Sequence, residues 1–296
     1  MTIKQLEAFY WVTRLRTFAA AASKLHATQS TISSRIQLLE QSLGTRLFDR
    51  ESHAARLTAK GRELVPQAER LLGLVTQIRG TVGNPRALSG VIRVGVAEFV
   101  AHAWLSRWAA AANERYPGVV LEMDVDLTLN LRDKLASGRI DLALLPGPLH
   151  DPGLVEHSLG GVQFEWMANP SLGVPTSPLR PADFQGFPLI LLSEKSNLHA
   201  MLLDWFESAG VTVRRVDIVN SLATVATLTL AGLGIAYLPL EYHRADLDAG
   251  RLQLVEVEPH LPPLEYVTAH RRDLAEPLVP LLAHLARDIS DFARLP

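Results

Sequence analysis

The sequence predicts an α/β protein with three parts: an N-terminal winged helix-turn-helix, a long linker helix and a C-terminal two-lobed domain. Residues 1–58 carry apolar side chains at helical spacing, followed by one short basic hairpin pattern. Residues 59–82 form a single long amphipathic stretch, and residues 90–296 alternate between short apolar runs and helical segments. A chain of 296 residues is long enough for two or three compact units.

Composition excludes several classes of protein. Hydrophobic residues make up 48% of the chain and charged residues 20%, which is ordinary for a folded globular protein. The chain has no cysteine, so a disulfide framework, a thiol nucleophile and a thiolate metal site are excluded. The first residues lack the pattern of a secretory signal, and we therefore expect a cytoplasmic protein.

An uncharged stretch at residues 218–240 is long enough to span a bilayer. Gly232, Gly234 and Pro239 interrupt it, so the pattern favours a helix, a glycine turn and a buried strand over a membrane helix.

Charge is distributed unevenly along the chain. Residues 1–89 hold 13 Lys and Arg against 6 Asp and Glu, a net charge of +7. The remaining residues hold 29 − 13 = 16 against 31 − 6 = 25, a net charge of −9. The basic part suggests a polyanionic partner, although an ordinary solvated surface would also carry such charges.

Helices are predicted over residues 4–15 and 18–25, followed by a third that Thr28 caps and Gly44 ends. The apolar stripe of this third helix comprises Ile32, Ile36, Leu39 and Leu43. The opposite side carries Ser30, Ser34, Gln37 and Gln41, with Ser33 at its flank. Short hydroxyls and amides can approach base edges in a DNA groove, but a solvated helix face remains the alternative.

A short hairpin pattern follows, built on Leu47 and Phe48, a turn at residues 51–54, and Leu57. Its basic side chains, which could lie along a phosphate backbone or simply be solvated, are Arg46, Arg50, His53 and Arg56.

Thr58 is predicted to cap the long helix over residues 59–82. Its apolar seam is formed by Leu64, Ala68, Leu71, Val75, Ile78 and Val82. This heptad spacing predicts dimerisation, or else packing on the chain's own C-terminal domain. Residues 83–90 are expected to be a hinge.

Beyond the hinge, strands are expected at residues 91–96, 119–125, 140–145, 189–192, 213–219 and 234–238, with helices between them. This alternation is typical of parallel α/β sheets. Ligands of open α/β sheets bind beyond the carboxyl ends of the strands, which predicts a binding cleft there.

Five segments carry a family resemblance. They are "LEAFYWVTRLRTFAAAASKLHATQSTISSRIQLLEQSLGTRLFDRESHAARLTAKGREL", "GVIRVGV", "ERYPGVVLEM", "LASGRIDLALLPGP" and "AGLGIAYLP". In this order, over essentially the whole chain, they resemble the LysR-type transcriptional regulators. The resemblance implies a homotetramer paired through linker helices and a periplasmic-binding-protein-like effector domain that holds a small metabolite between two lobes. It divides the chain into a DNA-binding domain (1–58), a linker (59–89) and an effector domain (90–296), with lobe I at about 90–162 and 267–296 and lobe II at about 163–266.

The candidate DNA-binding residues, from the resemblance and from the basic hairpin, are Gln29, Ser30, Thr31, Ser33, Ser34, Arg35, Arg50, His53 and Arg56. Where the family often has proline and arginine, this chain has Ser30 and Ser34.

The candidate effector-binding residues are Glu98, Phe99, Thr128, Pro146, Ser193, Ser196, Asn197, Asn220 and Ser221. Glu98 and Phe99 stand where the family commonly has a small hydroxyl residue, and Thr128 matches a frequent family contact. A carboxylate there would favour a cationic, amine-bearing or polyhydroxyl ligand, unless Glu98 pairs with a nearby arginine. The Ser and Asn residues could hold an anion or serve as ordinary helix N-caps.

The sequence fits two other classes of protein, an enzyme and a plain solute-binding protein, less well. The chain lacks a Walker loop and the motifs G-x-G-x-x-G, H-E-x-x-H and G-x-S-x-G, so we expect neither an enzyme nor a cofactor or metal site. A plain solute-binding protein fits poorly with the basic first 89 residues. The prediction is a ligand-responsive transcriptional regulator that binds double-stranded DNA, a small-molecule effector and further copies of itself.

Overall fold

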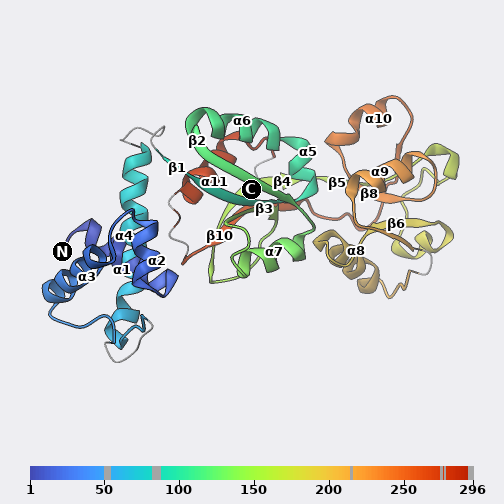
Figure 1. Cartoon of the computed structure of the whole chain (residues 1–296). Coiled ribbons are helices and arrows are strands. Elements are labelled where there is room, and N and C mark those ends of the chain that lie inside the picture. The colour runs from blue at the N-terminus through green and yellow to red at the C-terminus, as the bar shows by residue number, and fades with distance from the viewer. Residues whose placement is uncertain (50–54, 82–87, 214–215, 274–275, 277, 293–296) are drawn as a thin grey trace. The chain divides into compact units, whose positions relative to one another are not determined.

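The structure is a computed structural model that describes residues 1–49, 55–81, 88–213, 216–273, 276 and 278–292 (Figure 1). The chain divides into two compact units. Residues 1–87 with 273–281 form the N-terminal unit, and residues 88–272 with 282–296 form the C-terminal unit.

The N-terminal unit contains four helices among its described residues: α1 (Ile3–Leu15), α2 (Phe18–Lys24), α3 (Gln29–Leu43) and α4 (Ala59–Thr81). The predicted helices are confirmed. Three threonine N-caps, at Thr2, Thr17 and Thr28, begin the first three helices, each accepting a backbone N–H bond. A single antiparallel bridge between Phe48 and Leu57 marks the base of the predicted hairpin, whose residues 50–54 lie outside the described residues.

The end of α3 corrects one prediction. Ile32, Ile36 and Leu39 are buried as expected, but Leu43 is 40% exposed. Gly44 follows it with φ +66°, a left-handed conformation that glycine adopts without steric cost. Leu43 therefore lies where the chain already turns away from the core.

Helix α4 corrects a second prediction. Ala68 and Leu72 are buried in the core of the N-terminal unit, with Leu64 and Leu71 packed against it. The first half of the predicted seam is therefore not available to another chain. Farther along the helix, Leu74 is 57% exposed and Ile78 is 52% exposed, while Val82 lies outside the described residues.

The first lobe of the C-terminal unit is built on a five-stranded sheet of order β2-β1-β3-β10-β4. The strands are β1 (Ser89–Val96), β2 (Gly118–Val125), β3 (Leu142–Pro146), β4 (Leu154–Val162) and β10 (Leu264–Arg271). Strands β2 and β3 pair parallel to β1, as expected, but β10 pairs antiparallel to both β3 and β4. The sheet is therefore mixed: the predicted parallel pairing holds for β1, β2 and β3, but not for β10.

Helices cover both faces of this sheet, with α6 on one side and α7 on the other (Figure 1). They are α5 (Glu98–Ala103), α6 (Leu105–Arg115), α7 (Thr128–Ala136) and α11 (Leu278–Ile289), of which α11 begins in residues assigned to the N-terminal unit. Right-handed crossovers that run in opposite directions from a central strand place their helices on opposite faces. The carboxyl ends of β1 and β2 lead into the starts of α5 and α7.

The second lobe carries two smaller sheets. The chain returns to the sheet of the first lobe at Leu264, slightly before the predicted residue 267. Strands β8 (Ala236–Pro239) and β9 (Gln253–Leu254) flank β5 (Phe164–Ala168), and β6 (Leu189–Leu192) pairs parallel with β7 (Val216–Val219). A bridge between Leu189 and Ile235 connects the two sheets. The helices are α8 (Asn197–Ser208), α9 (Leu222–Leu230) and α10 (Arg244–Asp248). The uncharged stretch forms β7, α9 and β8, and no helix of the described residues is long and apolar enough to cross a membrane.

A histidine cluster lies between the sheet and α11. The rings of His157 on β4 and His284 on α11 stack at 5.5 Å between centroids, and His270 on β10 is buried beside them. Burial lowers the pKa of His157, and the charges of His284 and Arg287 lower it further. Burial likewise lowers the pKa of His270, outweighing its hydrogen bond with the Arg271 carbonyl.

We expect the folded protein to lose stability as pH falls below about 6.5, the ordinary histidine pKa. The unfolded chain takes up protons there first, because His157 and His270 bind them less readily when folded. In thermal melts between pH 7.5 and 5.5, His157→Gln should reduce this loss, and substitution of the exposed His150 should not. Equal pH dependence in wild type and His157→Gln would contradict the assignment.

Candidate nucleic-acid interface and ligand cleft

The polar side of α3 is exposed in the N-terminal unit. Gln29, Ser30, Ser34, Gln37 and Gln41 are exposed, and Thr31, Ser33 and Arg35 are half-buried at its edges. The apolar side packs into the core through Ile32, Ile36 and Leu39, where α3 contacts α1 and α2. The helix thus presents a row of short hydroxyls and amides to its surroundings.

The N-terminus of α3 holds three hydroxyl groups in contact. The Thr28 hydroxyl accepts a hydrogen bond from the Thr31 backbone N–H at 3.2 Å. Its oxygen also lies 2.9 Å from Ser30 Oγ and 2.8 Å from Thr31 Oγ1. The predicted Thr28 cap is confirmed. Helix N-termini attract anions through the helix dipole, so this end of α3 is suited to a phosphate oxygen.

The predicted wing is anchored to α3 by a carboxylate that sequence reasoning did not single out. Glu40 Oε1 accepts hydrogen bonds from the backbone N–H groups of Leu47 at 2.7 Å and Phe48 at 3.2 Å. Thr58 closes the other side, donating to the Arg46 carbonyl at 2.7 Å and capping α4 by accepting from the Gly61 N–H at 3.0 Å. A glutamate within a helix gives no local sign that it will bind backbone groups several residues downstream.

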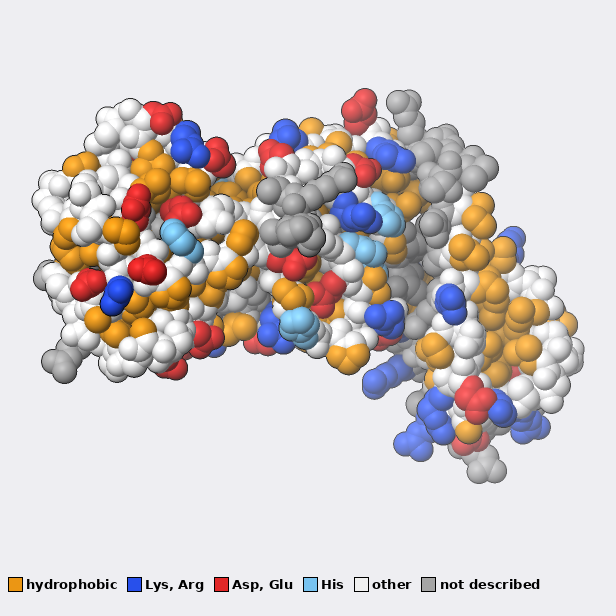
Figure 2. Space-filling view, turned by 180° about the vertical axis from the view of Figure 1, so that it is seen from behind, with side chains coloured by type: hydrophobic (Ala, Val, Ile, Leu, Met, Phe, Trp, Pro, Cys, Tyr) orange, Lys and Arg blue, Asp and Glu red, His pale blue; other side chains and the backbone are white. Residues whose placement is uncertain are grey.

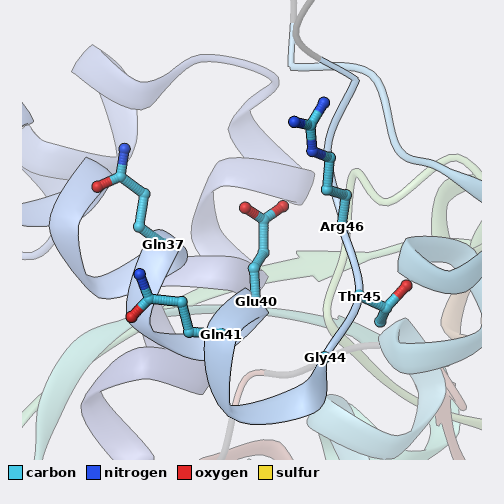
Figure 3. A pocket seen from close by; sticks show the side chains of 6 residues that line it. All are labelled: Gln37, Glu40, Gln41, Gly44, Thr45 and Arg46. Carbon is cyan, nitrogen blue, oxygen red and sulfur yellow. The ribbon is translucent and has the colours of Figure 1, made fainter.

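An open hollow separates the end of α3 from the segment leading to the wing (Figure 3). It is lined by Gln37, Glu40, Gln41, Gly44, Thr45 and Arg46. In Figure 3, Gln37 and Gln41 extend from the helix on one side and Arg46 from the facing segment. Arg46 and Arg56 are both exposed, whereas the candidates Arg50 and His53 lie outside the described residues. Lys and Arg side chains gather on one end of this unit in the space-filling view (Figure 2).

In the C-terminal unit, the carboxyl ends of the strands surround a small cavity of about 30 Å³ between the two lobes. Six of the candidate effector residues line it: Glu98, Phe99, Thr128, Pro146, Ser196 and Asn197. Ser193 and Asn220 are not among its lining residues, and Ser221 adjoins it through a hydrogen bond to Glu98. The cavity has room for one or two water molecules.

Glu98 reaches across this cleft from the first lobe to the second. Its carboxylate accepts hydrogen bonds from Ser221 Oγ at 2.9 Å and from the backbone N–H groups of Leu222 at 2.5 Å and Ala223 at 3.2 Å. His102 Nε2 lies 3.7 Å from Glu98 Oε1. Glu98 therefore binds the start of α9, and no arginine among the described residues forms an ion pair with it.

Phe99 lines the cavity and also belongs to an aromatic cluster. Its ring lies 5.6 to 6.0 Å from those of Phe164, Tyr242, Tyr266 and Phe292. Phe164 and Tyr242 belong to the second lobe, and Tyr266 and Phe292 to the first. Phe99 thus packs between the lobes as well as lining the cavity.

The opposite side of the cleft also has contacts between the lobes. Thr128 Oγ1 donates to Asn197 Oδ1 at 3.0 Å, and the Leu129 N–H donates to the Lys195 carbonyl at 3.0 Å. Ser196 and Ser221 are the N-caps of α8 and α9, as their alternative interpretation expected. Ser221 combines this role with its bond to Glu98.

Two polar residues that line the cavity, Asp126 and Tyr266, were not among the candidates from the sequence. Asp126 follows β2 directly, a position that the strand-end rule could have found. Burial opposes its ionisation, but hydrogen bonds from Lys134, Asn130 and the Leu127 N–H outweigh this and lower the pKa of Asp126. Tyr266 lies on β10, a strand that the analysis did not predict, and burial raises its pKa.

No group of three or more His, Cys, Asp or Glu side chains placed to hold a metal ion occurs among the residues that the structure describes. The lining of the cavity combines hydrogen-bond donors, hydrogen-bond acceptors and apolar side chains.

The helix-turn-helix exposes a polar helix, and it is joined to a two-lobed α/β domain. These two features together are typical of DNA-binding proteins that also carry a ligand-binding domain. Comparison with known proteins agrees. Residues 3–62 match the family described as bacterial regulatory helix-turn-helix protein, lysR family, and residues 85–290 match the LysR substrate binding domain. The chain belongs to the LysR family of transcriptional regulators, and it is not an enzyme.

Individual relatives span most of the chain. A probable hydrogen peroxide-inducible genes activator of Mycobacterium avium is 30% identical over 86% of this chain and 83% of its own length. The transcriptional regulator CzcR of Bacillus subtilis is 26% identical over 81% and 80%. The crystal structure of ArgP from Mycobacterium tuberculosis, 21% identical, covers 99% of this chain and 98% of its own with a TM-score of 0.60. This last likeness shows a shared fold.

Glu40→Ala should lower the free energy of unfolding by about 1–3 kcal/mol, because it leaves the Leu47 and Phe48 N–H groups without their acceptor. Gln37→Ala, an exposed position on the same helix, is the matched control and should stay within about 0.5 kcal/mol. Chemical denaturation measures both. Equal stability of the two variants would show that Glu40 does not anchor the wing.

Proposed function

We propose that this regulator reads operator DNA through α3 and the wing, and that a small metabolite bound between the two lobes changes how it holds that DNA. The observation that carries the proposal is the exposed row of Ser, Thr and Gln side chains on a helix whose other side is anchored in the core. We further propose that it acts in the cytoplasm, because its DNA target lies there.

The composition of this row supports DNA recognition over ordinary solvation. Ser and Thr are weaker helix formers than Glu, Lys and Arg, which are the usual residues of a solvated helix face. Short side chains let the helix backbone approach base edges closely, and amides can pair with adenine. Arg35, half-buried at the edge of the row, is proposed to contact a base, and Arg56, exposed on the wing, a phosphate.

A dimer is proposed through the distal half of α4. Leu74 and Ile78 are large apolar side chains more than half exposed on one helix, and burying them against a second α4 would remove them from water. The family resemblance extends this to a dimer of dimers. The first half of α4 is already used by the chain's own core.

The effector is proposed to be a small molecule. The names of the relatives do not identify it. One relative is named for hydrogen peroxide, but peroxide sensing through a thiol requires cysteine, and this chain has none. Binding of an effector would couple to DNA binding by about 1–3 kcal/mol, the usual size of such coupling.

Arg35→Ala should weaken binding to an operator selected from a random duplex pool more than binding to random DNA, because it removes a base contact. Arg56→Ala should weaken both alike and lower the salt slope by about 1, because it removes a phosphate contact. For the unaltered protein, affinity should fall roughly 10³- to 10⁵-fold between about 50 and 200 mM salt. Fluorescence anisotropy measures these values, and equal losses on both DNAs for both variants would refute the assignment.

The double variant Leu74→Glu/Ile78→Glu should be largely monomeric in sedimentation equilibrium, since two α4 helices would have to bury four carboxylates. Gln67→Glu, an exposed polar position on the same helix, serves as the control. If the double variant keeps the oligomeric state of the wild type, the dimer forms elsewhere.

A further inference from the structure

We propose that Glu98 is a built-in carboxylate ligand that latches the two lobes of the C-terminal unit closed and excludes small anions from the start of α9. The inference rests on the proposed role of the cleft as the effector site. It concerns what holds the cleft shut, and its test does not involve DNA.

The hydrogen-bond donors at the start of α9 suit it to bind a carboxylate. The first backbone N–H groups of a helix have no partners within the helix, and Glu98 accepts from two of them, at Leu222 and Ala223. The Ser221 hydroxyl adds a third donor to Glu98, and its oxygen at the same time accepts from the Thr224 N–H at 3.2 Å. Hydrogen bonds to an ionised carboxylate are roughly twice as strong as neutral ones, and the helix dipole favours the negative charge.

The acceptor comes from the other lobe. Glu98 begins α5, separated from β1 by the N-cap residue Ala97, and lies more than 120 positions from its partners in sequence. Its side chain is 20% exposed, so the charge is largely withdrawn from water and depends on these three donors. A carboxylate placed here has the contacts that an anionic ligand would otherwise make.

The latch acts together with contacts on the far side of the cleft. Thr128 donates a hydrogen bond to Asn197, and the Leu129 N–H donates one to the Lys195 carbonyl. Hydrogen bonds therefore connect the lobes at both ends of the cleft. The space left between them is about 30 Å³, too small for a metabolite. Any ligand larger than a few atoms therefore requires the lobes to separate, which breaks the Glu98 contacts.

Tethering gives Glu98 an advantage over free anions. A group held on the same chain acts at an effective concentration of millimolar or more, so a free carboxylate at low concentration does not displace it. Removal of the Glu98 carboxylate should therefore uncover a site for a small carboxylate such as formate.

The test uses the full chain and three variants. In Glu98→Ala, hydrogen exchange of a peptide containing the Leu222 and Ala223 amides should become about tenfold faster or more, because both lose a charged acceptor. Sodium formate, titrated at constant ionic strength against sodium chloride, should slow this exchange saturably and raise the Tm. The wild type and Glu114→Ala, an exposed glutamate on α6 of the same lobe, should not respond. Glu98→Ala/Ser221→Ala should respond more weakly than Glu98→Ala.

Glu98→Gln provides an independent measurement if the alanine variant does not fold, because it keeps the side chain's size and removes its charge. Its Leu222 and Ala223 amides should also exchange faster than those of the wild type. Unchanged exchange in either folded variant, or an equal formate response in wild type and Glu98→Ala, would overturn the latch. Neither outcome bears on DNA binding, which the Arg35 and Arg56 variants test separately.

Discussion

Burial of one side of α3 is the constraint on which the N-terminal unit depends. Ile32, Ile36 and Leu39 fill the space between α1 and α2, so the helix cannot rotate without exposing them to water. The opposite row of hydroxyls and amides is thereby held outward. Packing also places the wing, because Glu40 on the same helix binds the backbone at Leu47 and Phe48. The apolar core therefore orients both elements of the proposed DNA surface.

The C-terminal unit depends on a different kind of interaction, between a buried charge and unpaired backbone donors. Among the described residues, contacts between the lobes include the aromatic packing around Phe99 and the hydrogen bonds on either side of the cleft. A carboxylate that has lost most of its water needs donors, and the first turn of α9 needs acceptors. Each lobe supplies what the other lacks. In a protein of this family, such a bond lies where an effector would be expected to act, which makes its strength relevant to regulation.

The two corrections to the helices have a common cause. Heptad spacing in α4 indicates which side chains lie on one face of the helix, but it does not indicate what that face packs against. Ala68 and Leu72 face the chain's own core, whereas Leu74 and Ile78 are largely exposed. Leu43 similarly continues the stripe of α3 by spacing, yet lies beyond the last contact of the helix with the core. Periodicity identifies an apolar stripe, and only packing shows where its burial ends.

Local patterns were sufficient for much of this protein. The caps at Thr28 and Thr58, the end of α3 at Gly44 and the parallel core strands follow from short-range rules, because capping, turns and alternation act over a few residues. Contacts between segments that lie far apart in the sequence could be identified only from the tertiary structure. The antiparallel entry of β10, the cavity contact of Tyr266 and the partnership of Glu98 with Ser221 join residues more than a hundred positions apart. No local pattern encodes such pairs, since their geometry arises only when segments far apart in the chain fold against each other.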